Sequence, residues 1–180
     1  MGISWFQSAT FFTGNRLTVG FDYQHFGGES WNRVVATGER RPGVDKQVDE
    51  FAAYVDFRQD INGWLSLDAG VRVDHHSHVG TEWIPQGGLA FHLPESTELK
   101  AMVGKGYRNP TIKDMYMFPF PNPDLKPERL VSYELSFSQR KLGGALSYGA
   151  NLYYIDGDNI IVSNSSTRET LNSGEIENWG

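Results

Sequence analysis

The chain has 180 residues, enough for one domain, with a formal net charge of −6, 39% hydrophobic residues and no cysteine. The missing cysteines exclude disulfides and thiolate metal sites, and the acidic balance argues against a nucleic-acid-binding surface. No run of about 18 apolar residues exists, which excludes a transmembrane helix, although membrane β-strands alternate in polarity and escape that test.

Apolar and polar residues alternate along most of the chain with the period of two that is typical of β-strands. In residues 16–26, for example, Leu17 and Val19 fall on one face, whereas Thr18 and Asp22 fall on the other. In chain order the pattern predicts strands over 3–12, 16–26, 51–59, 64–74, 82–92, 97–105, 131–138 and 146–154, with a ninth from about Leu171. The alternation is less regular in 3–12, 82–92 and 97–105 than in the others. Most are roughly 9 to 12 residues long, enough to cross an outer membrane when tilted.

Short and long connections alternate between these strands. Tight turns are predicted at 13–15, 60–63, 93–96 and 140–144, and the longer connections at 27–49, 75–80, 107–129 and 156–170. All tight turns therefore fall at one end of the sheet, as in membrane barrels. The sequence predicts an all-β fold, an antiparallel transmembrane β-barrel of which about eight or nine meandering strands are present, with apolar faces toward lipid and polar faces toward a wet lumen.

The connection 107–128 differs in composition from the rest of the chain. Five prolines exclude a helix interior or a central strand there: Pro110, Pro119, Pro121, Pro123 and Pro127. Aromatic residues, two methionines and an arginine lie among them, so this stretch predicts a stiff loop that presents side chains.

The amino-acid sequence of this loop resembles that of a known family. Tyr107-Arg108-Asn109-Pro110-Thr111, Met115-Tyr116, Asn122-Pro123-Asp124-Leu125-Lys126-Pro127-Glu128 and Tyr133-Glu134-Leu135 are similar in order and spacing to the barrel of TonB-dependent outer-membrane receptors. The family has an aromatic-Arg-x-Pro box followed by an Asn-Pro-x-Leu-x-Pro-Glu box, and Asn109 stands where Ala or Ser is commoner. Asn172-Ser173-Gly174 is similar to an Asn-x-Gly segment that opens a later strand of the family.

The resemblance implies a receptor of the bacterial outer membrane that takes up a scarce metal complex, such as siderophore-iron or cobalamin, and is energised through TonB. It implies four kinds of partner: the receptor's own plug domain, the TonB complex, the extracellular ligand and outer-membrane lipid. No enzyme activity and no cofactor are expected. Neither a plug nor a signal peptide is visible in residues 1–180, so we expect a partial barrel from a longer protein.

Candidate ligand-binding residues lie in and beside this loop. Arg108 could grip a ligand or the plug through carboxylates, or could instead pin its own loop by bonding backbone carbonyls. Five further residues could stack on a flat ligand, bind Cu(I) through the thioethers, or form a small cluster that folds the loop on itself: Met115, Tyr116, Met117, Phe118 and Phe120.

The histidines His75, His76 and His78 form a second candidate site. His76 and His78 share a face and could chelate a metal, although a solvated turn is the competing interpretation. The stretch 156–159 has part of a calcium-loop pattern but lacks the glycine and the glutamate that complete it, which favours a turn.

Two other function classes stay open on sequence. One is a small self-closed β-barrel that binds a ligand, as in lipocalins, because eight strands suffice for such a barrel. The other is an outer-membrane enzyme, although no nucleophile elbow, phosphate loop or spaced triad is present.

Overall fold

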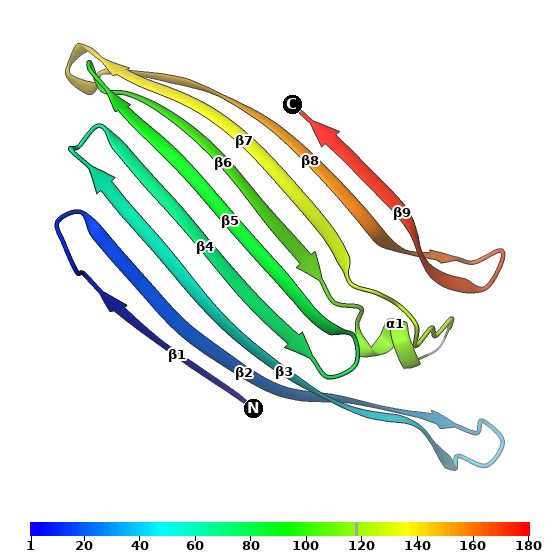
Figure 1. Cartoon of the computed structure of the whole chain (residues 1–180). Coiled ribbons are helices and arrows are strands. Elements are labelled where there is room, and N and C mark those ends of the chain that lie inside the picture. The colour runs from blue at the N-terminus through cyan, green and yellow to red at the C-terminus, as the bar shows by residue number, and fades with distance from the viewer. Residues whose placement is uncertain (118) are drawn as a thin grey trace.

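The computed structural model describes residues 1–117 and 119–180, and they form one antiparallel sheet with its strands in chain order (Figure 1). The strands are β1 Gly2–Ala9, β2 Asn15–Arg33, β3 Arg40–Ile61, β4 Leu65–His76, β5 Gly80–Leu93, β6 Thr97–Arg108, β7 Glu128–Lys141, β8 Leu146–Asn164 and β9 Glu169–Trp179. A one-turn helix, α1 Ile112–Tyr116, lies between β6 and β7, and a 3₁₀ turn, η1 Leu142–Gly144, between β7 and β8. The prediction of an all-β meander is confirmed.

The two ends of the sheet carry different connections. Residues 10–14, 62–64, 94–96 and 142–145 join strands at one end, here called the turn end. Residues 34–39, 77–79, 109–127 and 165–168 join them at the other, the loop end. Within the described residues β1 and β9 do not pair, so the sheet is an open curved wall and not the self-closed eight-stranded barrel considered above. No helix in the same residues is long and apolar enough to cross a membrane.

One face of the wall is apolar across several strands. Val19 lies opposite Val55, and Val55 lies opposite Val71, so the alternation of one strand continues into the next. This face is open: Val19 is 38% exposed and Leu135 is 52% exposed. The buried hydrophobic residues among those described are Val48, Ala52, Met115 and Leu125. The sheet therefore covers no dry core with its apolar face, as a lipid-facing barrel wall requires.

The opposite face is polar and hollowed. A hollow of about 790 Å³ is lined by residues of β2 to β7, and its charged members include Arg16, Asp56, Asp68, Lys100 and Glu134. Charged side chains of both signs on this face agree with the predicted wet interior.

The predicted loop 27–49 is instead mostly strand. β2 and β3 stay paired as far as Arg33 opposite Arg40, whereas β1 begins opposite Gln24 and β4 ends opposite Glu50. Residues 26–49 thus form a two-stranded ribbon without neighbouring strands. Glycines and charged residues occupy much of the ribbon, and Val48 is its one buried residue, so the sequence has no row of apolar residues to reveal it. β8 also continues through residues 156–164, where a loop was predicted; the register of β8 with β9 shifts between Gly157 and Ile161, which interrupts the alternation there.

Candidate functional site

The loop 109–127 folds around a short helix. The Thr111 hydroxyl accepts a hydrogen bond from the Asp114 amide at 3.1 Å, and the Asp114 carboxylate accepts one from the Thr111 amide at 3.1 Å. This capping box satisfies the first free amides of α1. The helix lasts one turn because proline occurs on both sides of it, at 110 and 119.

The base of the loop is closed by an ion pair between the two family boxes. Arg108 donates to Glu128 twice, from Nε at 2.5 Å and from Nη2 at 2.6 Å. Glu128 also accepts from the Ile161 amide at 2.8 Å, and it is 8% exposed. The guanidinium therefore pins its own loop, but through a carboxylate and not through the backbone carbonyls considered above. Its planar fork matches the carboxylate, which a lysine would not do.

Packing fixes the interior of the loop. Met115 is 0% exposed and Leu125 is 3% exposed, so Met115 has no surface to offer a ligand in this structure. The Lys46 ammonium lies 4.8 Å from the centroid of the Tyr116 ring, and the His78 ring packs edge-on with its centroid 5.7 Å from the same point. A Cβ placed on Gly28 would lie 3.1 Å from the Met117 methyl carbon, so α1 rests on the ribbon at a position without a side chain. The loop packs on the ribbon.

Three candidate ligand-contact residues keep part of their surface. Tyr116, Met117 and Phe120 are half-buried, and Phe118 lies outside the described residues. Their contact with a ligand stays a prediction.

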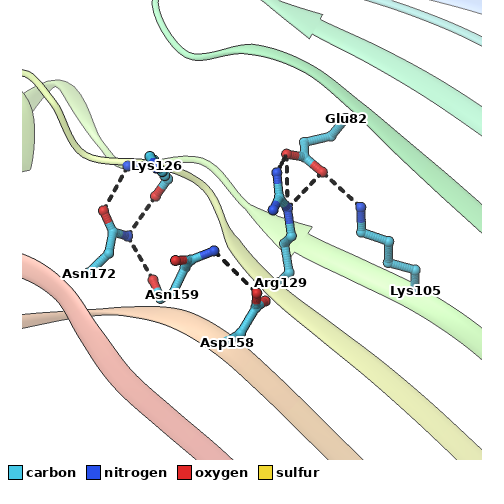
Figure 2. Close-up of polar contacts among 7 residues, drawn as sticks. All are labelled: Glu82, Lys105, Lys126, Arg129, Asp158, Asn159 and Asn172. Carbon is cyan, nitrogen blue, oxygen red and sulfur yellow. Dashed lines mark hydrogen bonds and ion pairs between the residues drawn. The ribbon is translucent and has the colours of Figure 1, made fainter.

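Asn172 ties the second family box to the far side of the sheet (Figure 2). Its Oδ1 accepts from the Lys126 amide at 2.8 Å, and its Nδ2 donates to the Lys126 carbonyl at 2.8 Å and to the Asn159 carbonyl at 2.7 Å. Asn122 of the same box donates to the Thr170 carbonyl at 2.7 Å. The Asn-x-Gly echo in the sequence thus includes a residue that docks onto the loop.

Glu82 forms a further cluster that the sequence did not reveal (Figure 2). Its carboxylate accepts from Arg129 at 2.5 and 3.1 Å and from Lys105 at 2.8 Å. A second set of polar contacts lies beside it, where Tyr107 donates to Asp74 at 2.8 Å and Arg72 joins Asp74 to Asp22. These contacts, together with the Asn109 bond to Glu50 at 3.1 Å, connect the loop to β2, β3, β4 and β5.

The histidines are brought together without forming a metal chelate. His76 is buried, and its Nδ1 accepts from the His78 amide at 3.1 Å, which occupies one possible ligand atom. Its Nε2 lies 3.7 Å from Glu50. Across the described part of the chain, no three His, Cys, Asp or Glu side chains are grouped as a metal site. The weak metal prediction for His76 and His78 gains no support.

Ser66, His92 and Glu98 line up at the turn end in the order of a catalytic triad. The Ser66 hydroxyl lies 3.0 Å from His92 Nε2, and His92 Nδ1 lies 3.2 Å from Glu98. However, Ser66 is 4% exposed and donates its hydroxyl proton to Asp60 at 2.6 Å. The oxygen is therefore neither accessible nor activated by the imidazole, and the arrangement is a wall contact and not a nucleophile.

Comparisons with known proteins agree with this geometry. Residues 2–180 match the family described as TonB dependent receptor-like, beta-barrel. The chain is 30% identical over 112 residues to the vitamin B12 transporter BtuB of Photobacterium profundum, covering 62% of this chain and 18% of that protein. It is 26% identical over 160 residues to the BtuB of Vibrio cholerae, covering 88% of this chain and 25% of that protein.

Solved structures share the fold at lower identity. The siderophore receptor PirA of Pseudomonas aeruginosa superposes with a TM-score of 0.78 at 20% identity, over 97% of this chain and 34% of that one. The ferric enterobactin receptor PfeA of the same organism, as a mutant in complex with enterobactin, gives 0.74 at 22% identity over 91% and 27%. The chain thus spans about a third or less of the proteins it matches. It belongs to the TonB-dependent receptor-like β-barrel family, whose barrels reside in the bacterial outer membrane and serve transport and not catalysis.

Proposed function

We propose that this chain is the loop-bearing part of the barrel of a receptor that captures siderophore-iron, cobalamin or a similar scarce metal complex outside the cell. The observation that carries the proposal is the loop 109–127, which is closed at its base by Arg108 and Glu128 at the loop end of a hollow polar wall. Import is then driven through TonB, and no covalent bond is made or broken.

Each surface of the wall has a role in this proposal. The exposed apolar face, with Val19 and Leu135, contacts outer-membrane lipid. The hollow face, with Arg16 and Asp68, faces a plug domain that the full-length receptor supplies. The loop end faces the outside of the cell.

The cargo class follows from the loop and from the relatives. Tyr116, Met117 and Phe120 offer aromatic and thioether surface that suits a flat or partly apolar complex better than a bare ion. The relatives named above are transporters of vitamin B12 and receptors of siderophores. Both cargos are large organic complexes of a metal.

The test is uptake by the full-length receptor in a bacterium that lacks its own cobalamin and enterobactin receptors. We expect saturable uptake of radiolabelled cyanocobalamin or radiolabelled ferric enterobactin, and loss of that uptake in a strain without TonB. Uptake of neither compound, or uptake that continues without TonB, contradicts the proposal.

The loop's part in binding is tested by replacing Tyr116 and Phe120 with alanine. We expect the half-saturating cargo concentration to rise about tenfold, because aromatic contact surface is lost. Tyr133→Ala is the matched control, since Tyr133 is 50% exposed on the lipid-facing side of β7. An equal effect of the control removes the loop from the binding site.

A further inference from the structure

The backbone pairing of the wall is interrupted beside the loop. β5 and β6 are paired from Gln86 opposite Gly104 to Leu93 opposite Thr97, and no pairing continues toward the loop end. Pro85 follows at once on the β5 side and has no amide proton to donate. β6 and β7, in contrast, stay paired as far as Arg108 opposite Glu128. The hairpin that carries the loop is thus unattached to β5 by its backbone at the loop end.

Glu82 of β5 bridges this interruption with its side chain (Figure 2). The carboxylate is 7% exposed and holds Lys105 of β6 and Arg129 of β7, with contacts of 2.5 to 3.1 Å. One buried anion with two cations is a strongly bound arrangement, because charge-assisted hydrogen bonds gain strength away from water.

The two cations flank the loop on both sides. Lys105 lies three residues before Arg108, after which the loop starts, and Arg129 directly follows Glu128, before which the loop ends. On β7, two adjacent side chains therefore make two different locks. Glu128 closes the loop on itself through Arg108, and Arg129 fixes the closed loop to β5 through Glu82.

The opposite side of the loop is held by neutral hydrogen bonds. Asn172 of β9 binds both backbone groups of Lys126, and Asn122 binds the Thr170 carbonyl. Glu82 is the charged fixed point on the β5 side, where backbone pairing is missing. Its loss would remove the charged attachment to β5, while the Tyr107–Asp74 and Asn109–Glu50 bonds and the contacts with β9 stay in place.

We infer that Glu82 is a positioning residue, which sets the place of the loop 109–127 at the loop end of the sheet and thereby the affinity for cargo. The affinity part of this inference rests on the proposed function. The positional part does not, because the contacts of Glu82 exist without any cargo.

The experiment uses the full-length receptor in lipid nanodiscs, with Glu82→Gln as the main variant. The amide keeps the shape of the side chain but cannot neutralise two cations. We expect amide hydrogen exchange in residues 109–127 to accelerate about tenfold, while β2, β3 and β8 exchange as before. Lys105→Gln leaves Arg129 in place and is expected to give a smaller acceleration in the same residues.

Glu95→Gln is the matched control. Glu95 pairs with Lys141 and so joins the same β5–β6–β7 hairpins at the turn end, on the surface. We expect no acceleration in 109–127 from this variant. Unchanged exchange in Glu82→Gln, or an equal acceleration throughout the barrel, overturns the inference. If Glu82→Gln does not assemble, Lys105→Gln decides by the same criterion.

Cargo uptake supplies the second measurement. For whichever of cyanocobalamin and ferric enterobactin the wild-type receptor imports, we expect the half-saturating concentration to rise about tenfold in Glu82→Gln with a maximal rate near that of wild type. A fallen maximal rate with unchanged half-saturation contradicts a positioning role. If the wild type imports neither compound, the proposed function fails, and the exchange experiment still decides whether Glu82 positions the loop.

Discussion

The loop end and the turn end of this sheet are held by different means, although the same strands form both. At the loop end Glu82, Glu128 and Met115 are buried, and side chains from distant strands meet there. At the turn end the connections depend on backbone geometry: Asn62 and Gly63, the two central residues of the turn closed by the Trp64 amide and the Ile61 carbonyl, both have positive φ, 49° and 71°, which matches the right-handed twist of the strands. Long-range contacts occur at the turn end too, as between Ser66 and His92, but each connection there is short and follows from local backbone geometry. The long connection at the loop end is held in place by contacts between residues far apart in the sequence.

The largest effect expected from this contrast comes from the loop interior. Met115→Ala removes a side chain with no exposed surface, and we expect the free energy of local loop opening to fall by about 2–4 kcal/mol. Hydrogen exchange of residues 109–127 measures it. Met102→Ala, at a residue that is 55% exposed on β6, should leave that exchange unchanged. Similar effects of both variants would show that the loop end has no packed interior.

The second effect compares two arginines of equal exposure. Arg108 and Arg58 each expose 54% of the side chain, but the partner Glu128 exposes 10% and the partner Asp60 exposes 47%. We expect Arg108→Ala to lower the free energy of unfolding by about 1–3 kcal/mol, because a nearly buried carboxylate loses its partner. Arg58→Ala at the turn end should change it little. Denaturant unfolding in detergent measures both, and equal losses would remove the proposed difference between the ends.

A smaller effect is expected at the far side of the loop. Asn172→Ala deletes three hydrogen bonds to backbone groups, of which water can replace those at exposed Lys126. We expect the free energy of loop opening to fall by about 1 kcal/mol. Proteolysis within 119–127 measures it, with Asn151→Ala at an exposed position of β8 as the control. No change in cleavage would mean that the loop is held from the β5 side alone.

The smallest effect is expected at the turn end. The Lys141 ammonium holds the pKa of the Glu95 carboxyl below its ordinary value of 4.5, and both groups are on the surface. Because the pKa of this carboxyl is lower in the folded than in the unfolded protein, the pair stabilises the folded state at pH values above the ordinary pKa. This stabilisation is lost as the pH falls through the pKa of the folded state. Glu95→Gln should therefore cause a barely measurable loss of thermal stability at neutral pH, which disappears in acid. A loss comparable with that of Arg108→Ala would contradict the contrast.

The alternation of apolar and polar residues was enough to predict the β-sheet. It predicted the strands, their order and the gathering of tight turns at one end, since the period of two is a local property of the chain. It failed in the ribbon, where no strand face carries a continuous row of apolar residues. Residues 27–49 were expected to be a loop and form most of the ribbon, because glycines and charges there leave no apolar face to detect.

The sequence predicted where along the chain the candidate site lies, but not which of its side chains contact one another. The two family boxes marked the loop, yet the pairing of Arg108 with Glu128 depends on the register of β6 with β7. The contacts of Glu82 with Lys105 and Arg129 could not be predicted from strand alternation at all. Lys105 follows Val103 by two residues, so strand alternation predicts that it shares the exposed apolar face with Val103. Its side chain instead reaches Glu82, because β6 is no longer paired with β5 beyond Gly104. Alternation along a strand no longer predicts which side chains meet once neighbouring strands stop pairing.

The ribbon has a practical consequence. Its tip includes Val35, which is 100% exposed, and Trp31 nearby is covered by the Arg40 guanidinium at 4.1 Å. Because the chain has no cysteine, a thiol introduced at position 35 would be unique within it and could carry a fluorophore. Quenching of that dye by Trp31 would then report on the conformation of the ribbon tip in the intact protein.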